Sequence, residues 1–367
     1  MRIGIDLRLH AYAPGGISRY ARRLARAIAE CVTADQLVLI SHRREEVPLE
    51  IPGVRTRRVI TPPHHALERW LLGLELRTLG LDVLHSTDFI PPAWGARRRV
   101  ITIHDLNFLY YPDYLTAEAR RYYNRQIEWA VARADAIVVD SYATQRDLVQ
   151  LLEVRTGSIT VAHLAADERF AVLPEAEVAQ ILSAYDLTPG YLLFVGVWEP
   201  RKNLPGLFEA LAILRDTGQR LTLAVVGRPG WLYAEVNASL QRLRLERWVR
   251  FIERPPVGDL VALYNGAQCL IIPSFYEGFG LPALEAMQCG TPVIVSDRAS
   301  LPEVVGEAGL LIDPDDPVTI ASACRQMVED AGLRRTLRAA GLARAQAFSW
   351  RQTAERTLQA YRAALAA

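Results

Sequence analysis

The chain has 367 residues, of which 50% are hydrophobic and 23% charged, with a formal net charge of +1. This length suits two domains, each able to bury its own core, and the near-neutral charge gives no case for nucleic-acid binding. No apolar run approaches the ~20 residues of a membrane-spanning helix, and the N-terminus MRIGIDLRLH lacks the apolar core of a signal peptide.

The first half of the chain alternates strand-like and helix-like segments. Strands are expected at 2–6, 37–41, 54–60, 83–85, 100–103, 136–139 and 159–161. Helices are expected at 17–31, 66–79, 118–133 and from Thr144, where Ser141 can serve as N-cap. This alternation predicts a mostly parallel, doubly wound α/β sheet.

A second alternation follows a stretch rich in prolines and acids at 173–190, which we interpret as the linker. Strands are expected at 191–195, 221–226, 249–251, 269–272, 292–296 and 309–312. Helices are expected at 204–215, 234–243, 258–268, from Pro282, from 318 onward and at 350–365. We therefore predict a first domain at 1–185, a second at 190–348, and a terminal helix at 349–367 that crosses back onto the first domain.

The four cysteines lie far apart without metal spacing, so free thiols in a reducing cytoplasm are expected for Cys31, Cys269, Cys289 and Cys324. Arginine pairs and triplets fall in the first half. Residues 1–185 nevertheless hold 23 Lys+Arg against 22 Asp+Glu. A weak peripheral membrane contact through this half therefore stays open beside the alternative of a solvated face.

The stretch SFYEGFGLPALEAMQCGTPVI, from Ser274 to Ile294, carries the strongest signal for a binding site. Gly278 and Gly280 leave the backbone bare where a helix begins, and free N–H groups at a helix N-terminus favour an anion such as phosphate. Glu277 and Glu285 bracket this turn, and ionised carboxylates accept hydrogen bonds from hydroxyl groups. A phosphate-binding turn between two acids that can bind hydroxyl groups predicts a nucleotide-sugar site.

A second segment, GVWEPRKN at 196–203, places Arg201 and Lys202 after the first strand of the second domain. Of the 42 basic residues, Lys202 is the single lysine. An arginine fork and a compact ammonium together suit a diphosphate leaving group, which gains negative charge as a glycosidic bond breaks.

Other candidates carry weaker signals. His104 follows a strand at the edge where α/β sheets bind ligands, and could contact a sugar or fill a structural role. Gly15 and Gly16 open the first helix, where a ligand could approach the backbone or a plain turn suffices. Candidates for holding a nucleotide base follow two later strands: Gly227, Arg228, Ile252 and Arg254. The pair His64-His65 has no acidic or cysteine partner at metal spacing, and we interpret it as a loop.

GFGLPA also fits a dinucleotide-binding fingerprint, with Asp297 at roughly the spacing of the ribose-binding acid. This pattern would make the chain an NAD- or FAD-dependent oxidoreductase. Glu277 at the mouth of the turn argues against it, and no residues for hydride transfer can be identified. A non-catalytic protein that only binds a nucleotide sugar is a further alternative.

Together these segments resemble the retaining glycosyltransferases of family four, which have the GT-B fold. The resemblance rests on EPRKN and on the two acids separated by seven intervening residues in FYEGFGLPALEAMQCGTPVI. It extends to PGGISRYARRL at 14–24, HDL at 104–106 and SLPEVVGEAGLLIDPDD at 300–316. It covers nearly the whole chain and is closest to bacterial mannosyltransferases of polysaccharide and O-antigen assembly. It implies two Rossmann-like domains that face each other across a cleft.

The resemblance also implies residue roles. Arg201 and Lys202 would hold the donor diphosphate, Glu277 the transferred sugar and Glu285 the ribose. Residues 278–281 (Gly278, Phe279, Gly280 and Leu281) would give backbone contacts to sugar and phosphate, and His104 would touch the sugar near its reacting carbon. Some relatives carry a further basic residue where this chain has Val197, so more of the phosphate binding is expected to fall on Arg201 and Lys202.

The expected activity is transfer of a hexose, foremost mannose from GDP-mannose, to a glycan or lipid-linked acceptor with retention of configuration. We expect no metal and no cofactor beyond the nucleotide-sugar co-substrate, because cationic side chains and helix N-termini can meet the phosphate charge. The expected location is the cytoplasm, with the inner face of the membrane as an alternative.

Overall fold

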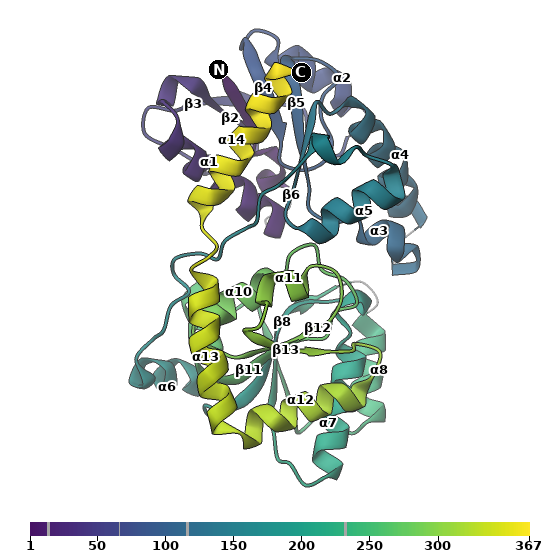
Figure 1. Ribbon diagram of the computed structural model, residues 1–367, viewed down its shortest axis with the longest axis vertical. Coiled ribbons are helices and arrows are strands. Elements are labelled where there is room, and N and C mark those ends of the chain that lie inside the picture. Colours follow the sequence, from purple (N-terminus) through teal and green to yellow (C-terminus); the bar gives the residue numbers. More distant parts are fainter. Residues whose placement is uncertain (13–14, 66, 115–116, 231–232) are drawn as a thin grey trace. The chain divides into compact units, whose positions relative to one another are not determined.

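The computed structural model describes residues 1–12, 15–65, 67–114, 117–230 and 233–367. The chain divides into two compact units, one formed by 1–164 with 349–367 and the other by 165–348. Each unit is a parallel sheet with helices packed on its faces, as the strand and helix alternation predicted (Figure 1).

The first unit contains a seven-stranded sheet in the order β3-β2-β1-β4-β5-β6-β7, and every neighbouring pair is parallel. Its strands are β1 (Ile3–Asp6), β2 (Leu37–His42), β3 (Arg55–Val59), β4 (Leu81–Ser86), β5 (Ala96–Ile103), β6 (Ala136–Val139) and β7 (Ile159–Val161). Its main helices are α1 (Gly16–Cys31), α2 (Glu68–Leu76), α3 (Asn107–Tyr110), α4 (Ala117–Arg133) and α5 (Tyr142–Leu152). The Ser141 hydroxyl accepts a hydrogen bond from Thr144 N at 3.1 Å, which confirms the predicted cap.

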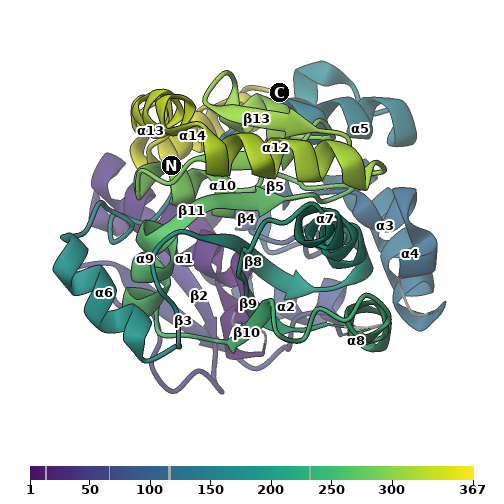
Figure 2. The same cartoon turned by 90° about the horizontal axis from the view of Figure 1, so that it is seen from below.

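The second unit contains a six-stranded parallel sheet in the order β10-β9-β8-β11-β12-β13. Its strands are β8 (Tyr191–Trp198), β9 (Leu223–Pro229), β10 (Val249–Glu253), β11 (Ala267–Ile272), β12 (Val293–Ser296) and β13 (Gly309–Ile312). Its helices are α6 (Glu175–Ser183), α7 (Leu204–Asp216), α8 (Tyr233–Arg242), α9 (Val257–Gly266), α10 (Leu281–Gln288), α11 (Leu301–Val305), α12 (Pro317–Glu329) and α13 (Ala331–Ala345). Helix α7 packs against α8 and α12, and α9 against α6 and α10 (Figure 2).

The last helix, α14 (Trp350–Ala366), belongs to the first unit, as predicted. It packs beside α1 and over β4 to β7 (Figure 1), with Leu358 and Tyr361 buried. The Tyr361 hydroxyl lies 2.6 Å from His85 Nδ1, and His85 Nε2 lies 2.7 Å from Thr102 Oγ1. Burial lowers the pKa of His85 to about 3, so this histidine is neutral and holds α14 to the sheet through hydrogen bonds.

Two details differ from the prediction. The units divide after Leu164, so the first unit ends earlier than 185, and the supposed linker contains helix α6, which packs on α9. Its apolar residues Val178 and Leu182 are buried, whereas the prolines and acids around them suggested a linker. The helix expected at 258–268 ends at Gly266, and β11 follows without a connecting loop.

The strand order locates the edge of each sheet at which ligands are expected. In the first unit the chain reverses its direction of winding between β1 and β4, and in the second between β8 and β11. Open α/β sheets bind ligands outside the carboxyl ends of the two strands that flank this switch point. Ligand-binding residues are therefore expected in the loops after β1, β4, β8 and β11.

Candidate active site

The loops after β8 and β11 form one polar cluster in the second unit. A short 3-10 turn, Pro200–Lys202, follows β8, and residues 273–280 connect β11 to α10. Phe275 N donates a hydrogen bond to Arg201 O at 2.9 Å, which ties the two loops together. Both cations predicted from EPRKN therefore lie against the predicted glycine-rich turn.

Glu277 is the centre of this cluster. Its Oε1 accepts hydrogen bonds from Lys202 Nζ at 2.5 Å and from the Ser274 hydroxyl at 2.7 Å. Its Oε2 accepts from Arg201 Nη1 at 3.1 Å, and Arg201 Nη2 donates to Glu199 Oε1 at 2.7 Å. Two cations thus face two carboxylates, and all four side chains are largely buried.

The electrostatics fix the charge of Glu277. Burial opposes its ionisation, yet Lys202 and Arg201 outweigh burial and hold the pKa of Glu277 at about 2. Burial lowers the pKa of Lys202, and Arg201 lowers it further, although Glu277 opposes both. Glu277 is therefore an anion at neutral pH, and its lone pairs are shared with cations that a diphosphate would also attract.

The turn before α10 is buried, and its contact with a ligand stays a prediction. Gly280 has φ 97°, a left-handed conformation that favours glycine, and a Cβ there would lie 2.6 Å from Leu301 Cδ2. Helix α10 begins at Leu281, one residue before the expected Pro282. Gly278 has no side chain and Phe279 is buried, so these two residues can offer a ligand only backbone groups.

Glu285 lies on α10 and is also buried. Its Oε2 accepts a hydrogen bond from the Tyr264 hydroxyl at 2.8 Å, from the last turn of α9. A carboxylate oxygen has two lone pairs, so this bond orients Glu285 without exhausting its capacity to accept.

The residues proposed for the nucleotide base lie on the other side of β8. Gly227 of β9 lies beside Gly196 of β8, and a Cβ at Gly227 would lie 1.8 Å from Gly196 O. Arg254 N donates to Gly227 O at 2.9 Å, so the ends of β9 and β10 are joined. Arg228 and Arg254 are exposed and Ile252 is buried, so the arginines are the members of this group that a ligand can reach.

His104 lies in the first unit, directly after β5, and both of its ring nitrogens are engaged. Nδ1 lies 2.6 Å from Asp140 Oδ2, and Nε2 lies 3.0 Å from Thr87 O. Burial opposes protonation, but Asp140 outweighs it and raises the pKa of His104 to about 9. The imidazolium therefore donates from both nitrogens, and a sugar contact would replace the bond to Thr87 O. Its role in transfer stays a prediction.

At the other predicted glycine pair, Gly15 is the N-cap of α1 and Gly16 its first residue. Gly15 N donates to the Ser18 hydroxyl at 2.9 Å, and no atom lies within 4 Å of a Cβ built on Gly16. Gly15 and Gly16 are exposed, while Ala13 and Pro14 of the same loop lie outside the described residues, so a ligand contact here stays a prediction.

Among the described residues, no three His, Cys, Asp or Glu side chains gather in a way that could hold a metal ion. In the same part of the chain no helix has the length and apolar character needed to cross a bilayer. The described cysteines are free thiols, as expected.

Two family models match the chain. The model for glycosyl transferases group 1 matches residues 183–344, and the model for Glycosyltransferase Family 4 matches residues 14–170. Among solved structures, HepE of Anabaena in complex with UDP and glucose superposes with a TM-score of 0.77 at 18% identity, covering 98% of both chains. Sucrose-phosphate synthase of Thermosynechococcus elongatus gives 0.77 at 23% identity, over 99% of this chain and 98% of the other.

The fold and the site thus define a GT-B glycosyltransferase, and the chain belongs to glycosyltransferase family 4. It is 32% identical to O-antigen chain mannosyltransferase B of Escherichia coli over 371 residues, 96% of this chain and 97% of the relative. It is also 31% identical to a D-inositol 3-phosphate glycosyltransferase of Saccharomonospora viridis, over 86% of this chain and 81% of the relative. It is a nucleotide-sugar-dependent hexosyltransferase.

This membership replaces the two alternatives that the sequence left open, the dinucleotide-dependent oxidoreductase and the non-catalytic binder. The local geometry explains why the fingerprint misled. In a dinucleotide-binding turn the first glycine directly follows the strand, whereas β11 ends at Ile272 and Gly278 comes only after Glu277. Asp297 is exposed and forms an ion pair with Arg298.

Several polar residues of both units were missed from the sequence. Glu199 accepts a hydrogen bond from Arg201, and Ser274 donates to the Glu277 carboxylate. Ser300 donates to Glu277 O at 2.7 Å. In the first unit, Asp140 pairs with His104 and Arg8 with two acids. The position of Glu199 just before Arg201 was a usable signal, because acids beside a strand-end cation often pair with it.

Proposed function

We propose that the chain transfers mannose from GDP-mannose, with retention of configuration and without a divalent metal, to a glycan or lipid-linked saccharide during cell-surface polysaccharide assembly in the cytoplasm. The observation that carries the proposal is the pairing of Arg201 and Lys202 around Glu277 at the switch point of the second sheet. Similarity to the O-antigen mannosyltransferase supports mannose as the sugar.

Arg201 and Lys202 would bind the diphosphate, whose oxygens compete with Glu277 for the two cations. Lys202 has three N–H donors, and among the described residues its ammonium donates to Glu277 Oε1. It can therefore bind Glu277 and a phosphate oxygen at the same time. The backbone at the start of α10 would add uncharged donors. Glu277, released in part from the cations, would accept hydrogen bonds from the sugar hydroxyls, and Glu285 would accept from the ribose.

In the proposed reaction the bond between the anomeric carbon and the diphosphate oxygen breaks, and the electron pair leaves with the diphosphate. The acceptor hydroxyl oxygen bonds to the same face of that carbon, and its proton passes to a diphosphate oxygen. The products are the glycoside and GDP. Arg201 and Lys202 would stabilise the charge that builds up on the leaving group, which is the step where fixed cations contribute most.

The test uses the purified full chain with a panel of nucleotide sugars in the presence of EDTA. With an acceptor present, GDP-mannose should give the highest rate of nucleoside diphosphate release in the panel. NMR of the product should show the same anomeric configuration as the donor. A higher rate with a uridine nucleotide sugar would refute the donor assignment. Loss of activity in EDTA that returns with Mg²⁺ would refute metal independence.

We also propose a peripheral contact with an anionic membrane through helix α2. One face of this helix exposes apolar side chains at i, i+3, i+4 and i+7, and a tryptophan from the loop before β5 lies over Gly73 beside them. This apolar stripe consists of Leu67, Trp70, Leu71, Leu74 and Trp94, which are between 39% and 51% exposed. Such a stripe with tryptophan is typical of helices that lie in a membrane interface.

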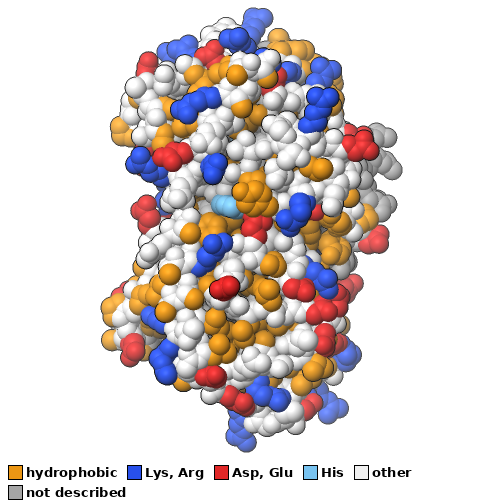
Figure 3. All heavy atoms as spheres, viewed as in Figure 1, with side chains coloured by type: hydrophobic (Ala, Val, Ile, Leu, Met, Phe, Trp, Pro, Cys, Tyr) orange, Lys and Arg blue, Asp and Glu red, His pale blue; other side chains and the backbone are white. Residues whose placement is uncertain are grey.

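Cations border the stripe. Arg57 donates to Glu75 O of α2 at 3.4 Å, Arg77 follows the helix, and Arg97 follows Trp94, and all three are exposed. On the face drawn in Figure 3, by contrast, basic and acidic side chains are interspersed. Apolar side chains with bordering arginines fit a bilayer that contains anionic lipids.

The contact can be measured by co-sedimentation with vesicles of phosphatidylglycerol and phosphatidylcholine. Trp70→Ser with Leu74→Ser should weaken binding at least fivefold without changing GDP affinity. Val318→Ser, which removes an exposed apolar side chain from α12 of the second unit, is the matched control. Equal vesicle binding by wild type and the double variant would refute the contact.

A further inference from the structure

The chain passes between its two units twice, and both connections contact the part of the second unit that carries the donor residues. The first passage follows Leu164, and the second follows Phe348. Each connection places one phenylalanine ring against an aromatic side chain, Phe170 in the first and Phe348 in the second. Both of these ring contacts lie within the second unit, 165–348.

The first connection contains a turn that buries its phenylalanine. Arg169 N donates to Asp167 Oδ1 at 3.1 Å, and Phe170 N donates to Asp167 O at 3.0 Å. An aspartate that bonds the backbone two residues further on is typical of a turn. Phe170 is 3% exposed, and its ring centroid lies 5.7 Å from that of Tyr264 with the rings at 76°. Aromatic rings prefer this edge-to-face arrangement.

Polar contacts fasten the same connection to helices α9 and α10. Asn265 Nδ2, from the last turn of α9, donates to Ala171 O at 2.9 Å, and Asn265 Oδ1 accepts from Leu173 N at 2.9 Å. Gln288 Nε2, at the end of α10, donates to Asp167 O at 3.2 Å. The first connection is therefore held on the helix that carries Glu285 and on the helix beside it.

Tyr264 joins this connection to a proposed donor residue. It is fully buried, its ring meets Phe170, and its hydroxyl donates to Glu285 Oε2 at 2.8 Å. The ring contact fixes where the hydroxyl lies, and the hydroxyl fixes one oxygen of the carboxylate. A change in the first connection therefore reaches Glu285 through a single side chain.

The second connection contacts the glycine-rich turn before α10. The Phe348 ring centroid lies 5.9 Å from that of Phe279 with the rings at 78°, and Phe279 lies between the two glycines of the turn. Arg344 places its guanidinium carbon 4.9 Å from the Phe348 centroid and donates to Val304 O at 3.0 Å. Phe348 directly precedes Ser349, the N-cap of α14. A displacement at the start of α14 therefore acts on this ring first.

We infer that Phe170 and Phe348 are positioning residues for the donor site, and that donor binding is linked through them to the conformation of both connections. The inference rests on the proposed function, which assigns Glu285 to the ribose and residues 278–281 to sugar and phosphate. Such a link is reciprocal. A donor that fixes Glu285 and the turn also fixes the connections, and a change in either connection alters the affinity for the donor.

Titration calorimetry with GDP on the full chain tests the first ring. Phe170→Leu should weaken GDP binding by about two- to fivefold, and by no more than Glu285→Ala does, because the ring acts through that acid. In the Glu285→Ala background the same substitution should cause no further loss, since the group through which it acts is gone. Wild-type affinity in Phe170→Leu, or a loss that persists in full in the double variant, would overturn the inference.

Phe108→Leu is the matched control. Phe108 is 7% exposed and its ring stacks on Tyr123, but it lies in the first unit. This variant should lower the melting temperature as Phe170→Leu does, yet bind GDP with wild-type affinity. An equal loss of GDP affinity in both variants would show an effect of general stability and would also overturn the inference.

The second ring is tested by a pair of substitutions at one position. Phe348→Leu should weaken GDP binding by about two- to fivefold, because it removes the ring that packs on the phosphate-binding turn. Phe348→Tyr keeps the ring, and its added hydroxyl can reach solvent because Phe348 is only half-buried. It should therefore bind GDP as the wild type does. Equal affinities in Phe348→Leu and Phe348→Tyr would refute the role of this ring.

Hydrogen exchange in the wild-type chain tests the link in the opposite direction and needs no variant. Saturating GDP should slow amide exchange in both connections, 165–174 and 345–350, as well as in the turn 278–281. Protection of the turn with unchanged exchange in both connections would overturn the inference and leave the proposed function standing. Failure of the wild type to bind GDP would instead refute the proposed function, and the inference would fall with it.

Discussion

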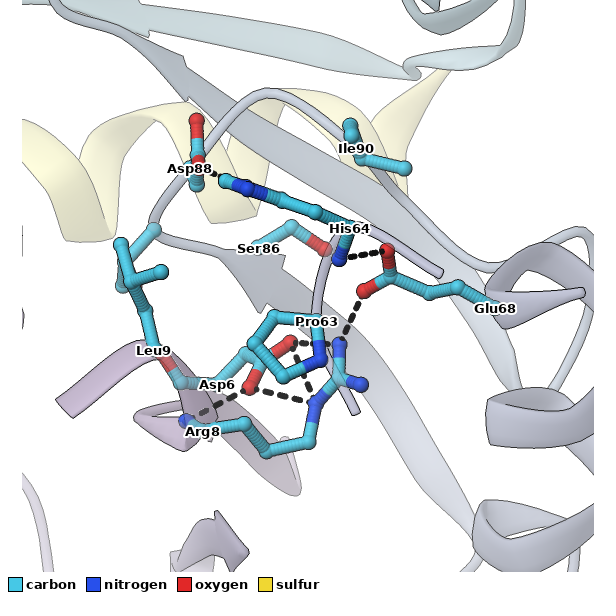
Figure 4. Close-up of a pocket in the computed structure, with 10 residues that line it drawn as sticks. Asp6, Arg8, Leu9, Pro63, His64, Glu68, Ser86, Asp88 and Ile90 are labelled. Carbon is cyan, nitrogen blue, oxygen red and sulfur yellow. Dashed lines mark hydrogen bonds and ion pairs between the residues drawn. The ribbon is translucent and has the colours of Figure 1, made fainter. Parts of the chain in front are cut away.

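The polar pocket of the first unit and the donor cluster of the second are built on the same plan. The pocket is lined by Asp6, Arg8, His64, Glu68, Ser86 and Asp88 (Figure 4). Each lies at the switch point of a parallel sheet, and each places an arginine shortly after the first of the two flanking strands. Arg8 binds Asp6 and Glu68, and Arg201 binds Glu199 and Glu277. In both cases the guanidinium joins a carboxylate from its own segment to one from a distant segment.

The two arginines differ in what else surrounds them. Arg8 is 1% exposed and its side chain has only acids and a carbonyl as partners, while the Arg201 side chain is 15% exposed and stands beside a second cation, Lys202. The donor cluster has equal numbers of cations and acids, and the pocket has more acids than cations. The two sites therefore share a plan but differ in the balance of charges, which is even in the donor cluster and acidic in the pocket.

The largest expected difference between the two sites appears when each arginine is replaced by methionine. Arg8→Met should lower the stability of the first unit by about 3–5 kcal/mol, because it leaves two buried acids without their partner. Arg201→Met should reduce kcat/KM about 100-fold, or ~2.7 kcal/mol. Its melting temperature should change less than that of Arg8→Met, because the donor cluster is closer to solvent and keeps Lys202. Calorimetry and steady-state transfer measure the two effects. Equal melting temperatures for the two variants would show that the arginines do not differ in this way.

The two units should lose stability at opposite ends of the pH scale. The pKa of Glu277 falls from 4.5 to about 2 on folding, so its contribution is present above pH 4.5 and is lost as the pH falls through 2. The pKa of His104 rises from 6.5 to about 9, so its contribution is present below pH 6.5 and is lost as the pH rises through 9. Each shift corresponds to about 3 kcal/mol at most.

Calorimetric melting from pH 2 to 10 tests this prediction. His104→Gln should flatten the alkaline loss of stability and Glu277→Gln the acid loss, each leaving the other unchanged. An alkaline slope that persists in His104→Gln would assign it to a different group.

Lys202→Arg keeps the charge of the donor cluster and changes its shape. The lysine ammonium lies 2.5 Å from Glu277 Oε1, and its stem passes near Gly196 at the end of β8. A second planar guanidinium beside Arg201 would crowd the diphosphate, since it needs more room and a fixed orientation. We expect normal folding and a loss of at least tenfold in kcat/KM, or ~1.4 kcal/mol. Transfer at the wild-type rate would show that charge alone suffices.

Most of the fold could be predicted because its strands are short apolar runs between clear turn signals. Strands such as 136–139, 159–161 and 309–312 lie where the sequence placed them. Helix α6 was missed because its two buried positions, Val178 and Leu182, are too few to outweigh the surrounding prolines and acids. Its partner on α9 lies more than 70 residues away in the sequence.

The donor cluster was predictable because its residues fall in two short segments with unusual composition. The pocket was not, because its polar residues come from three segments separated by about 20 to 60 residues and each looks ordinary alone. His64 has no acidic residue at metal spacing in the sequence, yet Asp88, from the loop after β4, lies 2.6 Å from its Nε2. Only the pairing of β1 with β4 brings Asp6 and Ser86 together, and nothing local in the sequence specifies that pairing.

The smallest expected effect concerns Glu285 and its hydroxyl partner. If Glu285 binds the ribose, Glu285→Ala should weaken GDP binding by about 0.5–1.5 kcal/mol, or two- to tenfold. Tyr264→Phe keeps the carboxylate but removes the hydrogen bond that orients it, so it should weaken GDP binding by a smaller factor in the same direction. Glu277→Ala should not weaken the binding of free GDP, because its proposed partner is the sugar, which GDP lacks, and because its removal frees Arg201 and Lys202 for the diphosphate. Titration calorimetry with GDP on all three variants separates these roles. Equal losses in Glu285→Ala and Glu277→Ala would mean that the two acids do not divide ribose and sugar between them, whereas no loss in Glu285→Ala would make Glu285 a structural partner of Tyr264 alone.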